Sequence, residues 1–234
     1  MRDERRNGDD RVKENELTGR RVLIMTAVEA EREAVLRGLG GDARFDARLA
    51  GVGPAGAAAR TAAALAAEDY ALVVSAGIGG GFSGVAPVGT VAIADRVVAA
   101  DLGAETGEGG FASVDELGFG SSVLEADERL ASALADALRA AGRAAALGPV
   151  LTVTTATGSQ GTADALARRT PGAVAEAMEG YGVAVAASER QTPFLEIRGI
   201  SNAIGPRDRS AWRIGDALEA LTAAITVLKE VVHP

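Results

Sequence analysis

The sequence predicts an α/β protein, arranged as a three-layer α/β/α sandwich around a mostly parallel central sheet. Short apolar stretches alternate along the chain with longer stretches of helical periodicity. The stretch 71–75 is apolar without alternation until its last residue, as expected for a strand that is covered on both faces. The chain has 234 residues, which is enough for one domain with a full core.

The elements of the first half each have a local signal. The first predicted helix carries Ala30, Ala34 and Val35 on one side, and the second opens with Pro54, which suits the first turn of a helix. An alanine-rich run continues that second helix. In chain order we expect a strand at 22–25, a helix at 29–39, a strand at 48–52, a helix at 54–67, a strand at 71–75, a tight glycine loop at 77–82 and a strand at 91–99.

The second half opens on a glycine-rich, acidic stretch at 103–120, which we interpret as a mobile loop. Farther along the chain, the stretch 150–155 is rich in β-branched residues, which favour a strand. The expected order is a helix at 127–140, a strand at 150–155, helices at 162–169 and 179–189, a strand at 194–198 and a helix at 212–232. No repeat or linker interrupts 20–234, so we expect a single domain there, preceded by a disordered leader at 1–19.

Composition excludes several classes of function. The net charge of −8 argues against nucleic-acid binding, which needs a basic surface. The absence of cysteine excludes disulfides, thiol catalysis and cysteine-ligated metals, and His233 is the only histidine. No apolar run reaches the ~18 residues of a membrane span, and the first twenty residues do not form a signal peptide. We therefore expect a cytoplasmic protein without metal or cofactor.

The segment Gly51-Val52-Gly53-Pro54-Ala55-Gly56 matches the glycine pattern of dinucleotide-binding folds, because it follows a strand and opens a helix. Such a site also needs an acid at the end of the next strand, and that strand ends at Ser75 without one. The glycines therefore indicate either a tight turn or backbone N–H groups that face a polar substrate group. A nucleotide-binding module without catalysis stays open as an alternative.

Three polar positions suggest chemistry on a nucleoside. Glu31 follows the first strand, where sites gather in α/β sheets, and can act as a base for water. Glu179 can accept from two ribose hydroxyls, and Met178 can cover the apolar face of the sugar. Asn202 can donate to N7 and O6 of a 6-oxopurine. Each position also has a purely structural interpretation. Glu31 can be an acid at a helix N-terminus, Glu179 a capping acid beside a core methionine, and Asn202 the cap of a turn.

The segment 205–213 holds Arg207, Arg209 and Arg213 in a chain that is acidic overall. A planar guanidinium suits a carboxylate on a ligand, so Arg207 and Arg209 are predicted to bind one. An ordinary surface loop with exposed ion pairs is the alternative.

These residues resemble the nucleoside phosphorylase and nucleosidase superfamily over about residues 21–232. In its methylthioadenosine/S-adenosylhomocysteine nucleosidase branch, an Ala-Met-Glu-x-Glu motif follows the first strand, and here Ala27-Val28-Glu29-Ala30-Glu31 stands there. The Glu-Met-Glu-Ala and Arg-x-Ile-Ser-Asp motifs of that branch correspond to Ala177-Met178-Glu179-Gly180 and Arg198-Gly199-Ile200-Ser201-Asn202. The resemblance implies a mixed, mostly parallel sheet and a homodimer.

Three departures look like the futalosine hydrolase branch. Asn202 replaces an aspartate that would suit adenine, Ala177 replaces a glutamate, and Ile78 replaces a serine near the attacking water. That branch cuts hypoxanthine from futalosine in menaquinone biosynthesis and leaves dehypoxanthinylfutalosine. Futalosine carries a benzoate, which would give Arg207 or Arg209 a partner.

The expected function is hydrolysis of a small purine nucleoside, with no nucleic-acid or membrane partner. The alternatives are a methylthioadenosine/S-adenosylhomocysteine nucleosidase and a phosphate-dependent purine nucleoside phosphorylase, which needs a phosphate site rather than a base for water. The expected catalytic residues are Glu31, Asn202 and Arg198, and the expected substrate-binding residues are Met178, Glu179, Ile78, Gly79, Arg207 and Arg209.

Overall fold

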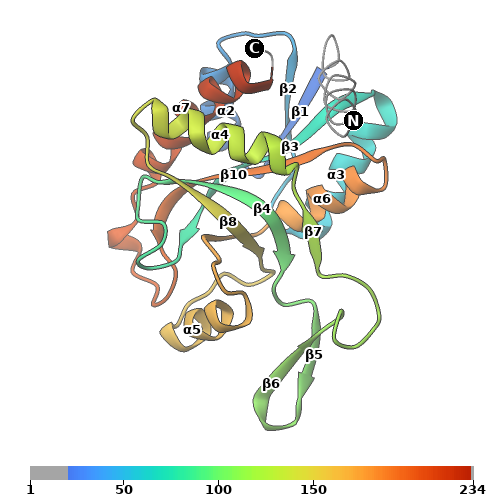
Figure 1. Cartoon of the computed structure of the whole chain (residues 1–234), viewed down its shortest axis with the longest axis vertical. Coiled ribbons are helices and arrows are strands. Elements are labelled where there is room, and N and C mark those ends of the chain that lie inside the picture. Colours follow the sequence, from blue (N-terminus) through green and yellow to red (C-terminus); the bar gives the residue numbers. More distant parts are fainter. Residues whose placement is uncertain (1–20, 233–234) are drawn as a thin grey trace, which may run out of the picture.

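The computed structural model describes residues 21–232, and in it helices surround a central sheet (Figure 1). The expected leader at 1–19 and His233 lie outside the described residues. The elements are β1 (Arg21–Thr26), α2 (Glu29–Leu39), β2 (Phe45–Leu49), α3 (Pro54–Ala67), β3 (Tyr70–Gly81), β4 (Val91–Ala99), β5 (Gly103–Thr106), β6 (Gly110–Ser113), β7 (Val123–Glu125), α4 (Glu128–Ala140), β8 (Ala145–Thr152), α5 (Gln160–Arg169), β9 (Ala175–Ala177), α6 (Gly180–Ser188), β10 (Phe194–Ala203) and α7 (Ile214–Val232).

The central sheet is mixed and closes on itself. Strand β3 pairs in parallel with β1 and β10 and antiparallel with β9. Strand β4 pairs antiparallel with β10 and in parallel with β8, which in turn runs parallel to β9. Strands β3, β10, β4, β8 and β9 therefore form a ring, from which β1 and β2 extend. The α/β class with a central sheet is confirmed, whereas the mostly parallel, three-layer description is not, because a sandwich sheet has open edges.

Helices cover the sheet in two groups. Helices α2, α4 and α7 pack together on one side, and α3 packs against α6 on another (Figure 1). Helix α4 shows why the sequence folds this way. Its apolar positions Leu130, Leu134 and Leu138 recur every four residues and are all buried, while the Asp127 carboxylate caps its first turn by accepting from the Leu130 N–H.

The glycine stretch after residue 76 is a strand and not the predicted tight loop, because β3 continues to Gly81. Its glycines are needed for close approach rather than for unusual backbone angles. A Cβ on Gly79 would lie 2.7 Å from the Glu176 carbonyl oxygen, and one on Gly81 would lie 2.0 Å from that of Ala86. The bare backbone lets neighbouring segments meet at the end of the sheet.

Several other boundaries differ from the prediction. Strand β2 spans 45–49 instead of 48–52, because the buried Phe45 starts it and the chain turns at Gly51, where φ is +77°. The stretch 103–120 contains the β5–β6 hairpin. Strand β8 spans 145–152 instead of 150–155, and β10 is longer than expected. The three-residue strands β7 and β9 were missed because they are too short to show a period.

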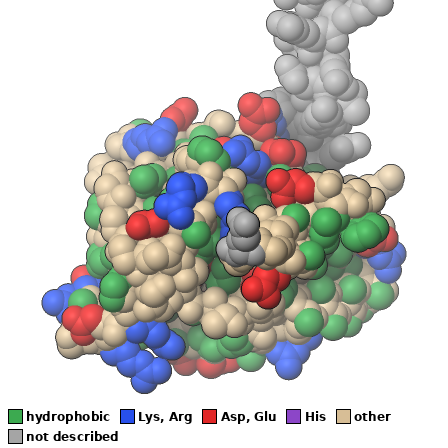
Figure 2. All heavy atoms as spheres, turned by 90° about the horizontal axis from the view of Figure 1, so that it is seen from below, with side chains coloured by type: hydrophobic (Ala, Val, Ile, Leu, Met, Phe, Trp, Pro, Cys, Tyr) green, Lys and Arg blue, Asp and Glu red, His purple; other side chains and the backbone are tan. Residues whose placement is uncertain are grey.

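The surface carries both signs of charge. On the face in Figure 2, acidic and basic side chains are interspersed and no continuous basic area is seen. Among the helices of residues 21–232, none is long and apolar enough to cross a membrane.

Candidate active site

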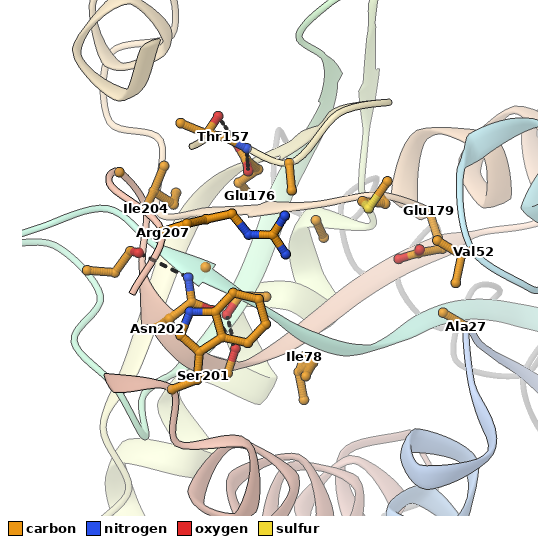
Figure 3. A pocket seen from close by; sticks show the side chains of 18 of the residues that line it. Ala27, Val52, Ile78, Thr157, Glu176, Glu179, Ser201, Asn202, Ile204 and Arg207 are labelled. Carbon is orange, nitrogen blue, oxygen red and sulfur yellow. Dashed lines mark hydrogen bonds between the residues drawn. The ribbon is translucent and has the colours of Figure 1, made fainter. Parts of the chain in front are cut away.

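A pocket of about 240 Å³ opens where β1, β3, β8 and β10 end (Figure 3). Ligand sites in α/β sheets gather at the carboxyl ends of strands, so this is the expected place. Seven of the nine predicted site residues line this pocket, namely Glu31, Ile78, Gly79, Met178, Glu179, Asn202 and Arg207. Arg198 lies beneath it, and Arg209 lies outside it.

Glu31 is buried at the start of α2 and held by backbone donors. One carboxylate oxygen accepts from the N–H groups of Ala27 and Val28 at 2.9 and 3.2 Å, and the other accepts from that of Ile78 at 2.9 Å. Burial raises the pKa of Glu31, while the nearby Arg198 guanidinium and these hydrogen bonds act in the opposite direction. The carboxylate is fixed in place at the wall of the pocket.

Arg198 joins the acidic groups below the pocket. Its guanidinium is only 1% exposed and forms ion pairs with Glu179 at 3.1 Å and Glu196 at 2.8 Å, with a further hydrogen bond to the Ser75 hydroxyl at 2.9 Å. A Cβ placed on Gly77 would lie 2.6 Å from both an Arg198 nitrogen and a Glu31 oxygen, so these two groups share the space that glycine leaves free. The three carboxylates raise the pKa of Arg198, which outweighs the effect of its burial.

Glu179 is held from two directions. One of its oxygens pairs with Arg198, and the other accepts from the Gly53 N–H at 3.2 Å. The glycine motif at 51–56 therefore places a backbone donor against a protein carboxylate, whereas the sequence left open a tight turn or a donor that faces a substrate group. Glu179 directly precedes α6 at its N-terminal end, and Met178 beside it lines the pocket.

Asn202 lies at the end of β10, farther along the pocket (Figure 3). Its amide oxygen accepts from the Ser201 hydroxyl at 2.8 Å, and its amide nitrogen donates to the Ala203 carbonyl at 3.0 Å. These contacts fix the orientation of the amide. They use one of its two N–H hydrogens and leave the other for a ligand. In this arrangement Asn202 has one hydrogen to donate to a purine, instead of the two that donation to both N7 and O6 requires.

The three arginines of 205–213 separate in space. Arg207 lines the pocket, and its guanidinium lies over the Trp212 ring at 5.5 Å from the centroid, a cation–π distance. Arg209 belongs to the short 3-10 helix Arg209–Ala211 and is exposed, and Arg213 donates to the Ser210 carbonyl. Only one of the two arginines predicted to bind a carboxylate is placed to do so.

Sequence reasoning missed two buried acids here. Glu196 shares a strand face with Arg198, two residues away, and an acid inside an apolar strand was the signal that could have found it. Its second oxygen has no hydrogen-bond partner among the described residues, and burial raises its pKa. Glu176 lines the pocket on β9, a strand that was not predicted. Among the side chains that the structure describes, no group of acids could hold a metal ion.

The fold and the pocket agree with a nucleoside-processing class of enzyme. The family model for the phosphorylase superfamily matches residues 14–233. Within it, the chain belongs to the futalosine hydrolase family. It is 48% identical to the futalosine hydrolase of Streptomyces coelicolor over 232 residues, which cover 91% of this chain and 96% of the relative. The identity to the protein of that name from Acidothermus cellulolyticus is 47% over 219 residues, covering 88% and 89%.

Solved structures share the fold at lower identity. The futalosine hydrolase of Helicobacter pylori has a TM-score of 0.76 at 15% identity, covering 91% of this chain and 97% of that one. The methylthioadenosine/S-adenosylhomocysteine nucleosidase of Neisseria meningitidis has a TM-score of 0.75 at 21% identity, covering 91% and 98%. At this low identity the two structures show only that the fold is shared.

Proposed function

We propose that this chain hydrolyses the N-ribosidic bond of futalosine and releases hypoxanthine and dehypoxanthinylfutalosine, a step of menaquinone biosynthesis. The observation that carries the proposal is that Glu31 and Glu179 line one pocket, with Arg198 beneath it paired to Glu179. The curated relatives, which are named futalosine hydrolases, supply the substrate. The reaction needs water and no metal or cofactor.

Glu31 activates the water in this scheme. Cleavage of an N-riboside passes through an oxocarbenium-like sugar, so a base must aim water at the anomeric carbon. The raised pKa of Glu31 moves it toward the range in which a carboxylate is an effective base near neutral pH. Its three backbone donors keep the carboxylate in one orientation, which reduces the entropic cost of the attack.

Glu179 and Met178 hold the ribose. The Glu179 carboxylate accepts from the sugar hydroxyls, and Arg198 positions it through the ion pair at 3.1 Å. Asn202 donates its remaining N–H to the purine, whose departing electrons need a hydrogen-bond donor. The end of β3 at Ile78 and Gly79 lets the backbone approach the sugar and base.

A panel of nucleosides tests this assignment. The protein is incubated with futalosine, inosine and methylthioadenosine, with and without phosphate, and the free base is followed by chromatography. We expect hypoxanthine from futalosine at a rate that phosphate does not change. Adenine release from methylthioadenosine alone, or a requirement for phosphate, would defeat the proposal.

Arg207 binds the benzoate of the substrate, whereas Arg209 does not. Replacing Arg207 with alanine is expected to raise KM for futalosine about tenfold or more, since a charge-assisted hydrogen bond is lost, and to change KM for inosine little. Arg209→Ala is the matched control, because Arg209 has the same charge on the same segment but lies outside the pocket lining. Equal effects of Arg207→Ala on both substrates would reject this role.

The single domain at 20–234, the homodimer and the cytoplasmic location remain predictions from the sequence and its resemblance to the family. The phosphorylase alternative is disfavoured because Arg207 is the one cationic side chain among the described residues that line the pocket. A phosphate site needs more positive charge or a nest of backbone donors, and the donors near Glu31 are already used by its carboxylate.

A further inference from the structure

The pocket contains a third acid, Glu176, in addition to Glu31 and Glu179. Glu176 is only 7% exposed, yet it lines the pocket. Thr157 donates to it twice, from its N–H at 2.8 Å to one oxygen and from its hydroxyl to the other. No ion pair to Glu176 is formed by any residue within 21–232. A buried acid without a cation is costly, so it is expected to serve a ligand.

Strand register places Glu176 and Asn202 on either side of one glycine. Gly80 of β3 pairs with Glu176 of β9 on one side and with Asn202 of β10 on the other. Residues paired across strands project from the same face of a sheet. A Cβ on Gly80 would lie 2.9 Å from the Ile204 side chain and 3.4 Å from the Asn202 amide nitrogen, so the apolar Ile204, which also lines the pocket, covers the glycine between the two polar groups. In the view of Figure 3 the Glu176 side chain and the Asn202 amide lie on opposite sides of the Arg207 side chain. This arrangement places polar groups on two sides of an apolar part of the pocket lining.

An ionised carboxylate can only accept hydrogen bonds. Thr157 uses one acceptor position on each oxygen of Glu176, so further positions remain for a ligand. A 6-oxopurine carries a hydrogen on N1 and can donate it there. Adenine has an unprotonated N1, which would bring two acceptors together and leave both unsatisfied in a buried place.

We infer that Glu176 is a specificity-determining residue of the base site, whose carboxylate accepts the N1–H of a 6-oxopurine and discriminates against adenine. The inference rests on the proposed function for the identity of the leaving group. It adds a second polar contact to that of Asn202, on the opposite edge of the base. A role limited to holding the 154–158 segment through Thr157 would not distinguish between bases.

Binding of the free bases tests this inference separately from turnover. Hypoxanthine and adenine are titrated calorimetrically into the wild type, into Glu176→Gln and into Glu33→Gln, an exposed acid on α2 as control. We expect the wild type and the control to prefer hypoxanthine. Glu176→Gln is expected to lose about 10- to 100-fold in hypoxanthine affinity but not in adenine affinity, because its amide can donate to the adenine N1.

An equal loss for both bases, or no loss, would overturn the role of Glu176. A second measurement uses the wild-type protein alone. 1-Methylhypoxanthine has no hydrogen on N1 and is expected to bind the wild type at least about tenfold more weakly than hypoxanthine. Equal affinity would also overturn the inference. If futalosine is not hydrolysed but these base preferences hold, the proposed reaction fails while the base site stands.

Discussion

Replacing Glu31 with glutamine is expected to lower kcat for futalosine about 100-fold or more, the usual scale for a positioned general base. Glutamine has nearly the same shape, and its one oxygen can accept from the Ala27 and Val28 N–H groups or from that of Ile78, but not from both sides. It cannot take a proton from water, so the chemical step slows while the fold is retained. The measurement is the steady-state rate of hypoxanthine release, with circular dichroism to check that the variant is folded.

Glu29→Gln is the matched control for this variant. Both acids stand in the first turn of α2 and interact favourably with the helix N-terminus, but Glu29 is exposed and pairs with Arg32. If the two acids served only the helix, both variants would lose the same small amount of stability and keep their activity. Normal turnover by Glu31→Gln, or equal losses in both variants, would remove Glu31 from the mechanism.

Replacing Arg198 with methionine is expected to lower the free energy of unfolding by about 3–5 kcal/mol at neutral pH, because breaking a buried ion pair leaves uncompensated charges. Arg198 is fully enclosed, and its loss leaves Glu179 and Glu196 without their cation. Chemical denaturation followed by circular dichroism measures the change. Arg139→Met is the control, because its exposed pair with Asp136 contributes about 1 kcal/mol or less.

The deficit of Arg198→Met should shrink as the pH falls. Burial already raises the pKa of Glu196, and removing Arg198 removes the main influence that lowers it. An acid with a raised folded pKa stabilises the fold below its unfolded pKa of about 4.3, and this contribution is lost as the pH rises through the folded value. The variant is therefore nearest to the wild type in acid. A deficit that does not change with pH would show that packing, not charge, dominates at this position.

The sequence contained enough to predict the residues of the site but not how each is held. Glu31, Glu179 and Asn202 could be found because each stands next to a strand or helix end with a recognisable motif. The ring of strands could not be predicted, because it is closed by β9, and a strand of three residues is too short to show an alternating pattern. Glu176 lies on β9, so its position in the pocket became known only from the structure, in which it pairs with Gly80.

Close contacts explain the other differences. The glycines after residue 76 suggested a loop, but they are strand residues, and the missing side chain of the first of them, Gly77, makes room for Glu31 and Arg198. Gly180 is similar, because a Cβ there would lie 2.0 Å from a Glu196 oxygen. A single sequence shows that a glycine is present, but not which distant atom would otherwise clash with it.

The most direct test of the account is the source of the oxygen on the anomeric carbon of the product. Futalosine is converted by the wild-type protein in ¹⁸O-labelled water with phosphate present, and the ribose product is analysed by mass spectrometry. Activation of water by Glu31 predicts a free anomeric hydroxyl that carries one ¹⁸O, together with unlabelled hypoxanthine. A ribose 1-phosphate product, or an anomeric oxygen without label, would contradict the mechanism.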